Sequence, residues 1–206
     1  MRNQLLNAGV GSLDGVLYTH SHADHVHGLD DLRMIFFNMR KRIDVWADQA
    51  TQNDLIERFK YAFVQPDDSP YPPILNLNTL DGITELYGDG GPINFVPFQV
   101  KHGNVNALGF RIGPLVYLPD VSEMSKEAWE EVKKAKCWIL DALRRNPHPS
   151  HSHLENSLEW IKISGIDKAI LTNMHVDLDY ETLIKETPKN VEPAFDGMVL
   201  DFEFSI

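Results

Sequence analysis

The sequence predicts a mixed α/β domain in which helices cover β-sheets. Runs with the apolar pattern of β-strands alternate along the chain with segments whose apolar residues recur at helical spacing. Between residues 83 and 119, short strand-like runs are separated by turn signals such as "GDGG" and "RIGP", which are typical of antiparallel hairpins. Helices packed outside mixed sheets would satisfy both patterns. With 206 residues, 43% of them hydrophobic, the chain suits one domain over 1–206 with a sizeable core.

In the first part of the chain, strands and helices are predicted to alternate. In order, the elements are a strand at 13–19, a helix at 28–40, a strand at 42–47 and a helix at 48–63. Asp48 is the expected N-cap of the second helix, because its carboxylate can accept a hydrogen bond from the first helical turn. The proline-rich segment 64–78 is predicted to be irregular, and it reads either as a lid near a site or as a surface loop.

The second part begins with the predicted hairpins and returns to alternating strands and helices. In order, the elements are strands at 83–88, 93–100, 107–113 and 115–119, a helix at 125–135, a strand at 137–143, a helix carrying Leu154, Leu158 and Ile161, a strand at 168–173, a helix at 179–186 and a strand at 198–204.

The composition argues against several classes of protein. A net charge of −11 disfavours a broad surface for nucleic acid or anionic membrane. No apolar run reaches the roughly 20 residues of a membrane span, and the first residues lack the basic start and apolar core of a signal peptide. With one cysteine, Cys137, the chain has no disulfide framework. We therefore expect a cytoplasmic protein with no membrane partner.

The segment "YTHSHADHVHG" (18–28) places several histidines and an aspartate directly after a predicted strand. Within this segment, the pattern H-x-H-x-D-H is formed by His20, His22, Asp24 and His25. Three further candidates lie at or just past the ends of other predicted strands: His102, Asp120 and His175. Because strand ends present side chains to a shared edge of a sheet, we expect all these residues to converge.

The residue types at these strand ends predict a metal site. Imidazole and carboxylate ligands without thiolate suit a pair of borderline divalent ions, zinc or manganese. Two ions about 3.5–4 Å apart need a bridging group, for which Asp120 is the candidate. Such ions would also create a local positive site that attracts an anionic substrate into an acidic protein.

These motifs resemble those of the metallo-β-lactamase superfamily, whose fold is an αββα sandwich with a dinuclear metal site at one edge. Within that superfamily, the chain is most similar to the PhnP-like phosphoribosyl cyclic phosphodiesterases, which open 5-phosphoribosyl 1,2-cyclic phosphate and are near relatives of the tRNA 3′-processing nucleases. The resemblance is carried by "THSHADHVHGLDDLR", "VKHGNVNALGFRIG", "YLPDVSEMSKEAW", "LDALRRNPHPSHSHLENSLEWI", "LTNMHVDLDYETL" and "VEPAFDGMVL".

The resemblance implies a role for each candidate ligand. One ion would be held by His20, His22 and His102. The other would be held by Asp24, His25 and His175, with Asp120 between the two ions. Asp24 would also be catalytic, by orienting the nucleophile.

The family also implies a histidine, placed just before a late helix, that protonates the leaving oxygen. The segment "HPSHSHLENSLEW" offers His153, which directly precedes the predicted helix, as the first choice for contacting the substrate and donating the proton. His151 is the second choice. Arg33, in "DDLR" just past the histidine cluster, is a candidate phosphate contact, and its alternative role is an ion pair on a solvated helix face.

One departure from the family concerns the N-terminal strands. Family members normally begin with a glycine-rich loop and strands that precede a segment resembling "MRNQLL", where this sequence starts. We therefore expect the N-terminal strands of the sandwich to be missing, which would leave sheet edges and apolar surface exposed.

Taken together, the residues and the resemblance predict a hydrolase with two divalent metal ions that cleaves a phosphodiester, most simply a small cyclic phosphate of the phosphoribosyl or nucleotide-like kind. Three rival functions are a hydrolase of another ester or thioester, an RNA-processing nuclease, and a non-catalytic metal-dependent binding or scaffold protein. The nuclease would need an extended basic arm for RNA, which the sequence does not offer. The expected partner is a small phosphorylated substrate, and a homodimer is expected from the resemblance alone.

Overall fold

The computed structural model describes residues 1–202. These residues divide into two compact units, the first spanning Met1–Ile93 and the second beginning at Asn94. The expectation of one domain over 1–206 stays a prediction. Each unit has its own hydrophobic core, so each is described by itself.

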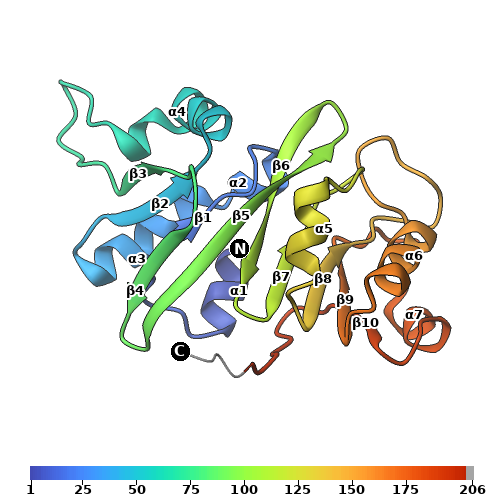
Figure 1. The fold of residues 1–206 in the computed structure, drawn as a ribbon. Helices are drawn as coiled ribbons and strands as arrows, with labels where there is room; N and C mark the ends of the chain where they lie inside the picture. The colour runs from blue at the N-terminus through green and yellow to red at the C-terminus, as the bar shows by residue number, and fades with distance from the viewer. Residues whose placement is uncertain (203–206) are drawn as a thin grey trace. The chain divides into compact units, whose positions relative to one another are not determined.

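The first unit carries a parallel sheet with helices packed on it (Figure 1). Its elements are α1 (Arg2–Asn7), β1 (Val16–Leu17), α2 (Ala23–Val26), the short 3-10 helix η1 (Leu29–Asp31), α3 (Leu32–Met39), β2 (Ile43–Ala47), α4 (Gln49–Phe63), β3 (Leu75–Thr79) and β4 (Thr84–Gly88). The strand order is β1-β2-β3, and both pairings are parallel, with Val16 opposite Val45 and Ile43 opposite Leu75.

The helices of the first unit form where the apolar spacing predicts them. Leu32 and Ile35 of α3 and Leu55 of α4 are buried against Val45 of β2 in one core cluster. Helix α4 begins as expected, because the Asp48 carboxylate accepts a hydrogen bond of 2.8 Å from the backbone N–H of Thr51. Burial of Ile43, Val45 and Ala47 on one face of β2 holds the sheet against the helices, and with it the segment that follows β1.

The second unit carries a mixed sheet with helices α5, α6 and α7 beside it (Figure 1). Its elements are β5 (Gly91–His102, which starts just before the boundary), β6 (Val105–Ile112), β7 (Leu115–Leu118), α5 (Lys126–Val132), β8 (Cys137–Asp141), α6 (Leu154–Ser164), β9 (Lys168–Thr172), α7 (Tyr180–Glu186) and β10 (Val191–Pro193). Within this unit the strand order is β10-β9-β8-β7-β6-β5.

The predicted hairpins are confirmed. Strand β6 pairs antiparallel with both β5 and β7, whereas β7, β8, β9 and β10 pair in parallel. The parallel strands β8 and β9 themselves carry apolar residues of the core, such as Trp138, Leu140 and Leu171, which are all fully buried. This arrangement confirms the predicted mixed α/β class and brings the carboxyl ends of the parallel strands to one edge of the sheet.

Three local predictions differ from the structure. Residues 75–79, expected to lie in an irregular loop, form β3, because Leu75 is buried and pairs with Ile43. The short helices α1 and α2 and the strand β10 have no predicted counterpart. In the expected strand at 198–204, residues 198–202 are not strand, and the remainder lies outside the described residues.

Across residues 1–202, no helix combines the length and apolarity that crossing a membrane would require.

Gly109 tests the packing of the second unit. It lies opposite Phe98, and a Cβ added there would sit 2.4 Å from Phe98 ring atoms and 3.0 Å from Leu118 Cδ1. We expect Gly109→Ala to lower the free energy of unfolding by about 1–3 kcal/mol, because the buried ring has to move. Urea unfolding measures the change. Gly82→Ala is the control, since its added Cβ meets nothing within 4 Å. Equal stability of the two variants would contradict this account of the packing.

Candidate metal centre

In the first unit, the histidine cluster follows the short strand β1. The Tyr18 N–H donates to the carbonyl of Trp46 on β2 at 2.9 Å, so the chain remains fixed to the sheet up to the start of the cluster. Thr19 and His20 are buried, and residues 23–26 then turn into the short helix α2. The predicted placement of His20 just past a strand is thereby confirmed.

The four side chains of the H-x-H-x-D-H pattern gather within this loop. The ring of His20 lies 4.6 Å from that of His22 and 4.4 Å from that of His25, measured between centroids. Nε2 of His25 lies 3.3 Å from Oδ2 of Asp24. Nδ1 of the buried His20 lies 3.1 Å from the Thr19 hydroxyl, which orients that imidazole. The structure therefore brings these four predicted ligands together.

Two residues of helix α4 form hydrogen bonds with Ser21, which lies within the histidine cluster. The Ser21 hydroxyl donates a short hydrogen bond to the Asp54 carboxylate, and Arg58 Nη1 donates to the Ser21 carbonyl at 2.6 Å. Arg58 and Asp54 also form an ion pair at 3.6 Å. Because Ser21 stands between His20 and His22, these contacts fix the backbone that carries both imidazoles.

In the second unit, His102 and Asp120 form a buried pair. His102 ends β5, Asp120 follows β7, and each side chain is 1% exposed. His102 Nδ1 lies 2.6 Å from the Ser150 carbonyl oxygen, which can only accept, so Nδ1 donates this hydrogen bond and leaves Nε2 for other contacts. That Nε2 lies 3.3 Å from Asp120 Oδ2. The Asn173 amide donates to the other Asp120 oxygen at 3.0 Å.

Beside this pair lies a second histidine–carboxylate pair. His151 Nδ1 is 3.0 Å from Oδ2 of Asp141, the fully buried last residue of β8. The same oxygen accepts from the N–H groups of Val121 and Ser152. Burial raises the pKa of Asp141 to about 6, and the hydrogen bond from His151 acts in the opposite direction. The His151 ring lies 4.6 Å from the ring of His102, between centroids.

The other two predicted histidines of the second unit lie differently. His153 is the N-cap residue of α6, as expected, and its side chain makes no capping hydrogen bond. His175 follows β9, as predicted; its side chain is 59% exposed and Nδ1 lies 3.4 Å from Asp177 Oδ1. Within the described part of the second unit, His175 shares no group of close ligand atoms with His102 and Asp120. Its role as a ligand stays a prediction.

Arg33 makes the ion pair that the sequence left open as its alternative role. Its guanidinium contacts Asp30 Oδ1 at 2.7 Å and lies over the ring of Tyr61, 5.8 Å from the centroid. A phosphate contact by Arg33 stays a prediction.

Sequence reasoning missed Asp141 and Asn173. Asn173 ends the predicted strand 168–173, the same signal that identified Asp120 and His102, whereas Asp141 lies inside the predicted strand 137–143 and ends only the shorter observed strand β8. Asn173 has a left-handed backbone with φ of 59°, a conformation that asparagine tolerates better than most residues, and this turn aims its amide at Asp120. The strand-end rule would have found Asn173 if amides had been included, but not Asp141.

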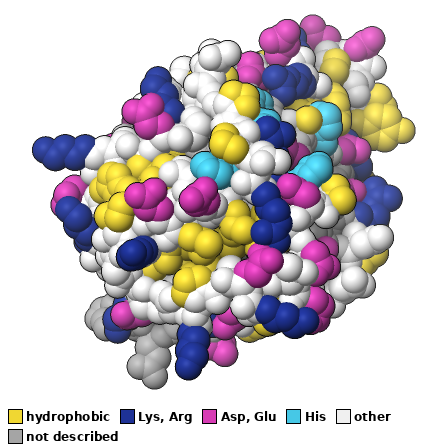
Figure 2. Space-filling model, turned by 90° about the vertical axis from the view of Figure 1, so that its right-hand side faces the viewer, with side chains coloured by type: hydrophobic (Ala, Val, Ile, Leu, Met, Phe, Trp, Pro, Cys, Tyr) yellow, Lys and Arg dark blue, Asp and Glu magenta, His cyan; other side chains and the backbone are white. Residues whose placement is uncertain are grey.

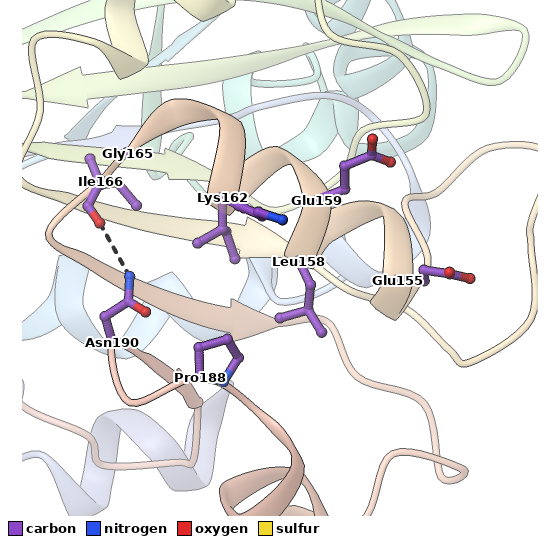
Figure 3. Close-up of a pocket in the computed structure, with 9 residues that line it drawn as sticks. Glu155, Leu158, Glu159, Lys162, Gly165, Ile166, Pro188 and Asn190 are labelled. Carbon is purple, nitrogen blue, oxygen red and sulfur yellow. Dashed lines mark hydrogen bonds between the residues drawn. The ribbon is translucent and has the colours of Figure 1, made fainter.

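The cavity on the surface of the second unit is lined by residues other than the candidate ligands. A cavity of about 840 Å³ on the second unit lies along α6, between Glu155, Leu158 and Lys162 on the helix and Pro188 and Asn190 on the segment after α7 (Figure 3). None of the residues that line it is a predicted ligand. Histidine side chains do reach the surface among acidic, basic and apolar ones on the face in Figure 2.

The donor atoms fit divalent metal ions. Buried imidazoles and carboxylates such as His20, His102 and Asp120 are costly to desolvate unless they are paired or bind a cation. The His102 ring donates one N–H to a backbone carbonyl, as metal-binding histidines commonly do, and its other nitrogen lies 3.3 Å from Asp120 Oδ2. His20, His22, Asp24 and His25 in one unit, and His102 and Asp120 in the other, could each contribute ligands.

Comparison with known proteins identifies the class. The family profile described as "Beta-lactamase superfamily domain" matches residues 2–175. The crystal structure of a diphosphatase of the PhnP family has a TM-score of 0.87 and 32% sequence identity, over 98% of this chain and 77% of that one. The protein is thus a member of the beta-lactamase superfamily and, within it, of the PhnP family. The predicted αββα fold class is confirmed.

More distant structures share the fold. YhfI from Bacillus subtilis has a TM-score of 0.70 at 18% identity, over 90% of this chain and 76% of that one. The short form of human tRNase Z has a TM-score of 0.69 at 17% identity, over 98% of this chain and 85% of that one. With the histidine–aspartate clusters, this hydrolase fold indicates that the protein binds divalent metal.

One curated relative carries a different description. An octanoyltransferase of Porphyromonas gingivalis is 32% identical over 200 residues, which is 96% of this chain and 39% of that protein. The chain therefore spans well under half of the relative it matches.

The raised pKa of Asp141 predicts how stability depends on pH in metal-free protein. Because its folded pKa, about 6, lies above the ordinary 3.8, the folded state binds this proton more tightly than the unfolded chain does. The contribution is therefore fully present below about pH 4 and lost as pH rises through about 6, by at most about 3 kcal/mol. Asp141→Asn removes the titration. Urea unfolding from pH 4 to 7 should show the stability of wild type falling relative to the variant, and parallel profiles would contradict the assignment.

Proposed function

We propose that the chain is a phosphodiesterase that uses two divalent metal ions, zinc or manganese. The ligands would be those that the sequence predicts: His20, His22, Asp24, His25, His102, Asp120 and His175. Support comes from the PhnP-family diphosphatase, at 32% identity over most of both chains. When bound, the ions would polarise phosphate oxygens and lower the pKa of water.

The observation that favours phosphoryl chemistry is the His151–Asp141 pair next to His102. Phosphodiester cleavage needs a proton on the leaving oxygen, and a histidine held by a buried carboxylate can keep that proton near neutral pH. Asp141 accepts from His151 Nδ1 at 3.0 Å, which leaves Nε2 as the nitrogen that would donate. His153 has no such carboxylate contact among the interactions of the described residues. We therefore assign proton donation to His151, with Asp141 as a positioning residue, and place His153 second.

The remaining residues then divide the work. Asp24, which is largely exposed, would orient the attacking nucleophile. Asn173 and Ser150 hold Asp120 and His102 in the orientation of ligands through their hydrogen bonds of 3.0 and 2.6 Å. The substrate would be a small cyclic phosphodiester, either phosphoribosyl or nucleotide-like. The cytoplasmic location and the homodimer stay predictions.

Acyl transfer, which the description of the curated relative raises, is less well supported in this chain. A covalent acyl transfer commonly uses an activated thiol. The one cysteine, Cys137, is 1% exposed, and burial raises its pKa, so no reactive thiolate forms there. Two further activities compete with phosphodiester cleavage, namely hydrolysis of a carboxylic ester or thioester and cleavage of RNA. The first would be detected as turnover of a carboxylic ester or thioester, and the second as cleavage of RNA.

Metal-dependent turnover tests the proposal directly. The metal-loaded protein should hydrolyse bis-p-nitrophenyl phosphate, and His102→Ala should lower turnover at least about 100-fold with less metal bound, because a buried ligand is removed. Absorbance at the nitrophenolate band and elemental analysis measure both. His27→Ala is the matched control, since His27 belongs to the same histidine-rich loop without contributing to a cluster of ligand atoms within residues 1–202. No phosphodiester turnover by metal-loaded protein would refute the proposal and favour a binding or scaffold role.

The choice between His151 and His153 is tested by the leaving group. An alkoxide needs a proton and p-nitrophenolate does not, so His151→Ala should slow cleavage of an alkyl or ribosyl phosphodiester by roughly 10²–10⁴-fold and spare the nitrophenyl ester. Steady-state kinetics on both substrates measure the contrast. His153→Ala should change both rates little. The reverse pattern would assign the proton to His153.

A further inference from the structure

A pocket of about 410 Å³ on the first unit is separate from the histidine cluster in its lining. Arg33 and Phe37 of α3, Tyr61 of α4, and Ser69 and Tyr71 of the proline-rich loop form its walls. This volume is within the range of small-molecule sites, which are mainly apolar and aromatic with a few polar groups. The loop that the sequence left open as a lid or a surface excursion is thus one wall of a pocket.

Three aromatic side chains of this pocket are exposed to solvent. Phe37 is 57% exposed, Tyr61 47% and Tyr71 73%. A single exposed aromatic residue is ordinary, but several around one concave site are typical of a binding surface. Aromatic rings bind flat partners by stacking, because such partners cover the whole face of the ring.

The charges of the pocket favour an uncharged flat group over a phosphate. Arg33 is the only cationic residue in the lining of this pocket, and Asp30 compensates it at 2.7 Å. Its guanidinium lies over Tyr61, whose hydroxyl donates to the same Asp30 carboxylate at 3.3 Å. Asp30 therefore holds both side chains in place before any ligand binds, and a guanidinium plane is itself a good stacking surface for a base.

We propose that this pocket binds the nucleobase of a nucleotide-type substrate. The inference rests on the proposed function only in treating the bound nucleotide as the substrate of the metal centre. Asp30 lies in η1, on the segment that runs from the histidine cluster into α3, so one continuous stretch of chain carries both the first-unit ligands and the pocket wall. Base binding would then select phosphodiesters that carry an aromatic base over those that carry sugar alone.

Adenosine tests the pocket without involving phosphate or metal. Titration calorimetry, supported by saturation-transfer NMR on the base protons, should detect adenosine binding to the metal-loaded protein. Phe37→Ala and Tyr61→Ala should each weaken that binding at least about five-fold, the low end of what loss of one base-stacking ring costs. Tyr87→Ala is the control, because Tyr87 is a 70% exposed tyrosine of the same unit outside the pocket. It should leave the affinity unchanged.

The outcomes separate this inference from the proposed function. Absence of adenosine binding at millimolar concentration, or equal weakening by Phe37→Ala and Tyr87→Ala, would overturn the pocket assignment even if the protein cleaves bis-p-nitrophenyl phosphate. Adenosine binding that depends on Phe37 in a protein without phosphodiester turnover would uphold the pocket and overturn the proposed function. Ribose 5-phosphate binding should be the same in Phe37→Ala as in wild type, and a matching loss for this ligand would also overturn the assignment to a base.

Discussion

The cost of burying polar groups at strand ends governs the structure of both candidate clusters. His20, His102, Asp120 and Asp141 are all at most 3% exposed, and each lies at or just past the end of a strand. A buried carboxylate or imidazole is tolerated only with partners, and here those partners are backbone N–H groups, the Asn173 amide, the Ser150 carbonyl and neighbouring imidazoles. The apolar cores of the sheets offset this cost, and divalent cations would complete the compensation of charge.

The class of fold and the first metal-ligand cluster were predictable because their signals are local. Strand and helix periodicity, the Asp48 cap and the H-x-H-x-D-H spacing each lie within one segment, so sequence alone identifies them. Strand β3 escaped prediction because its stability comes from pairing with β2 and from burial of Leu75, which are tertiary effects. The Asp141–His151 pair escaped for the same reason: ten residues and a loop separate the two side chains, and only the fold brings Nδ1 to 3.0 Å from the carboxylate.

Helix α4 carries both residues that position the first cluster and one that lines the pocket. Asp54 and Arg58 of α4 hold the Ser21 backbone, and Asp141 and Asn173 hold side chains at the edge of the second sheet. The pocket beside Arg33, in contrast, is completed by a proline-rich loop. Helices α3 and α4 thus contribute Arg33, Phe37 and Tyr61 to the pocket, and the loop adds Ser69 and Tyr71. Loop variation can change the substrate of such a fold without disturbing its chemistry.

The proposed function depends on the predicted ligands, from His20 to His175, binding divalent metal ions. An anomalous-scattering map of zinc- or manganese-loaded crystals, recorded on either side of the metal's absorption edge, tests this claim most directly. The account predicts a pair of peaks, one within ligand distance of His20, His22 and His102 and the other beside Asp24 and His25, with Asp120 between them. Absence of peaks, or a single ion bound by one unit alone with His102 and Asp120 turned elsewhere, would contradict it.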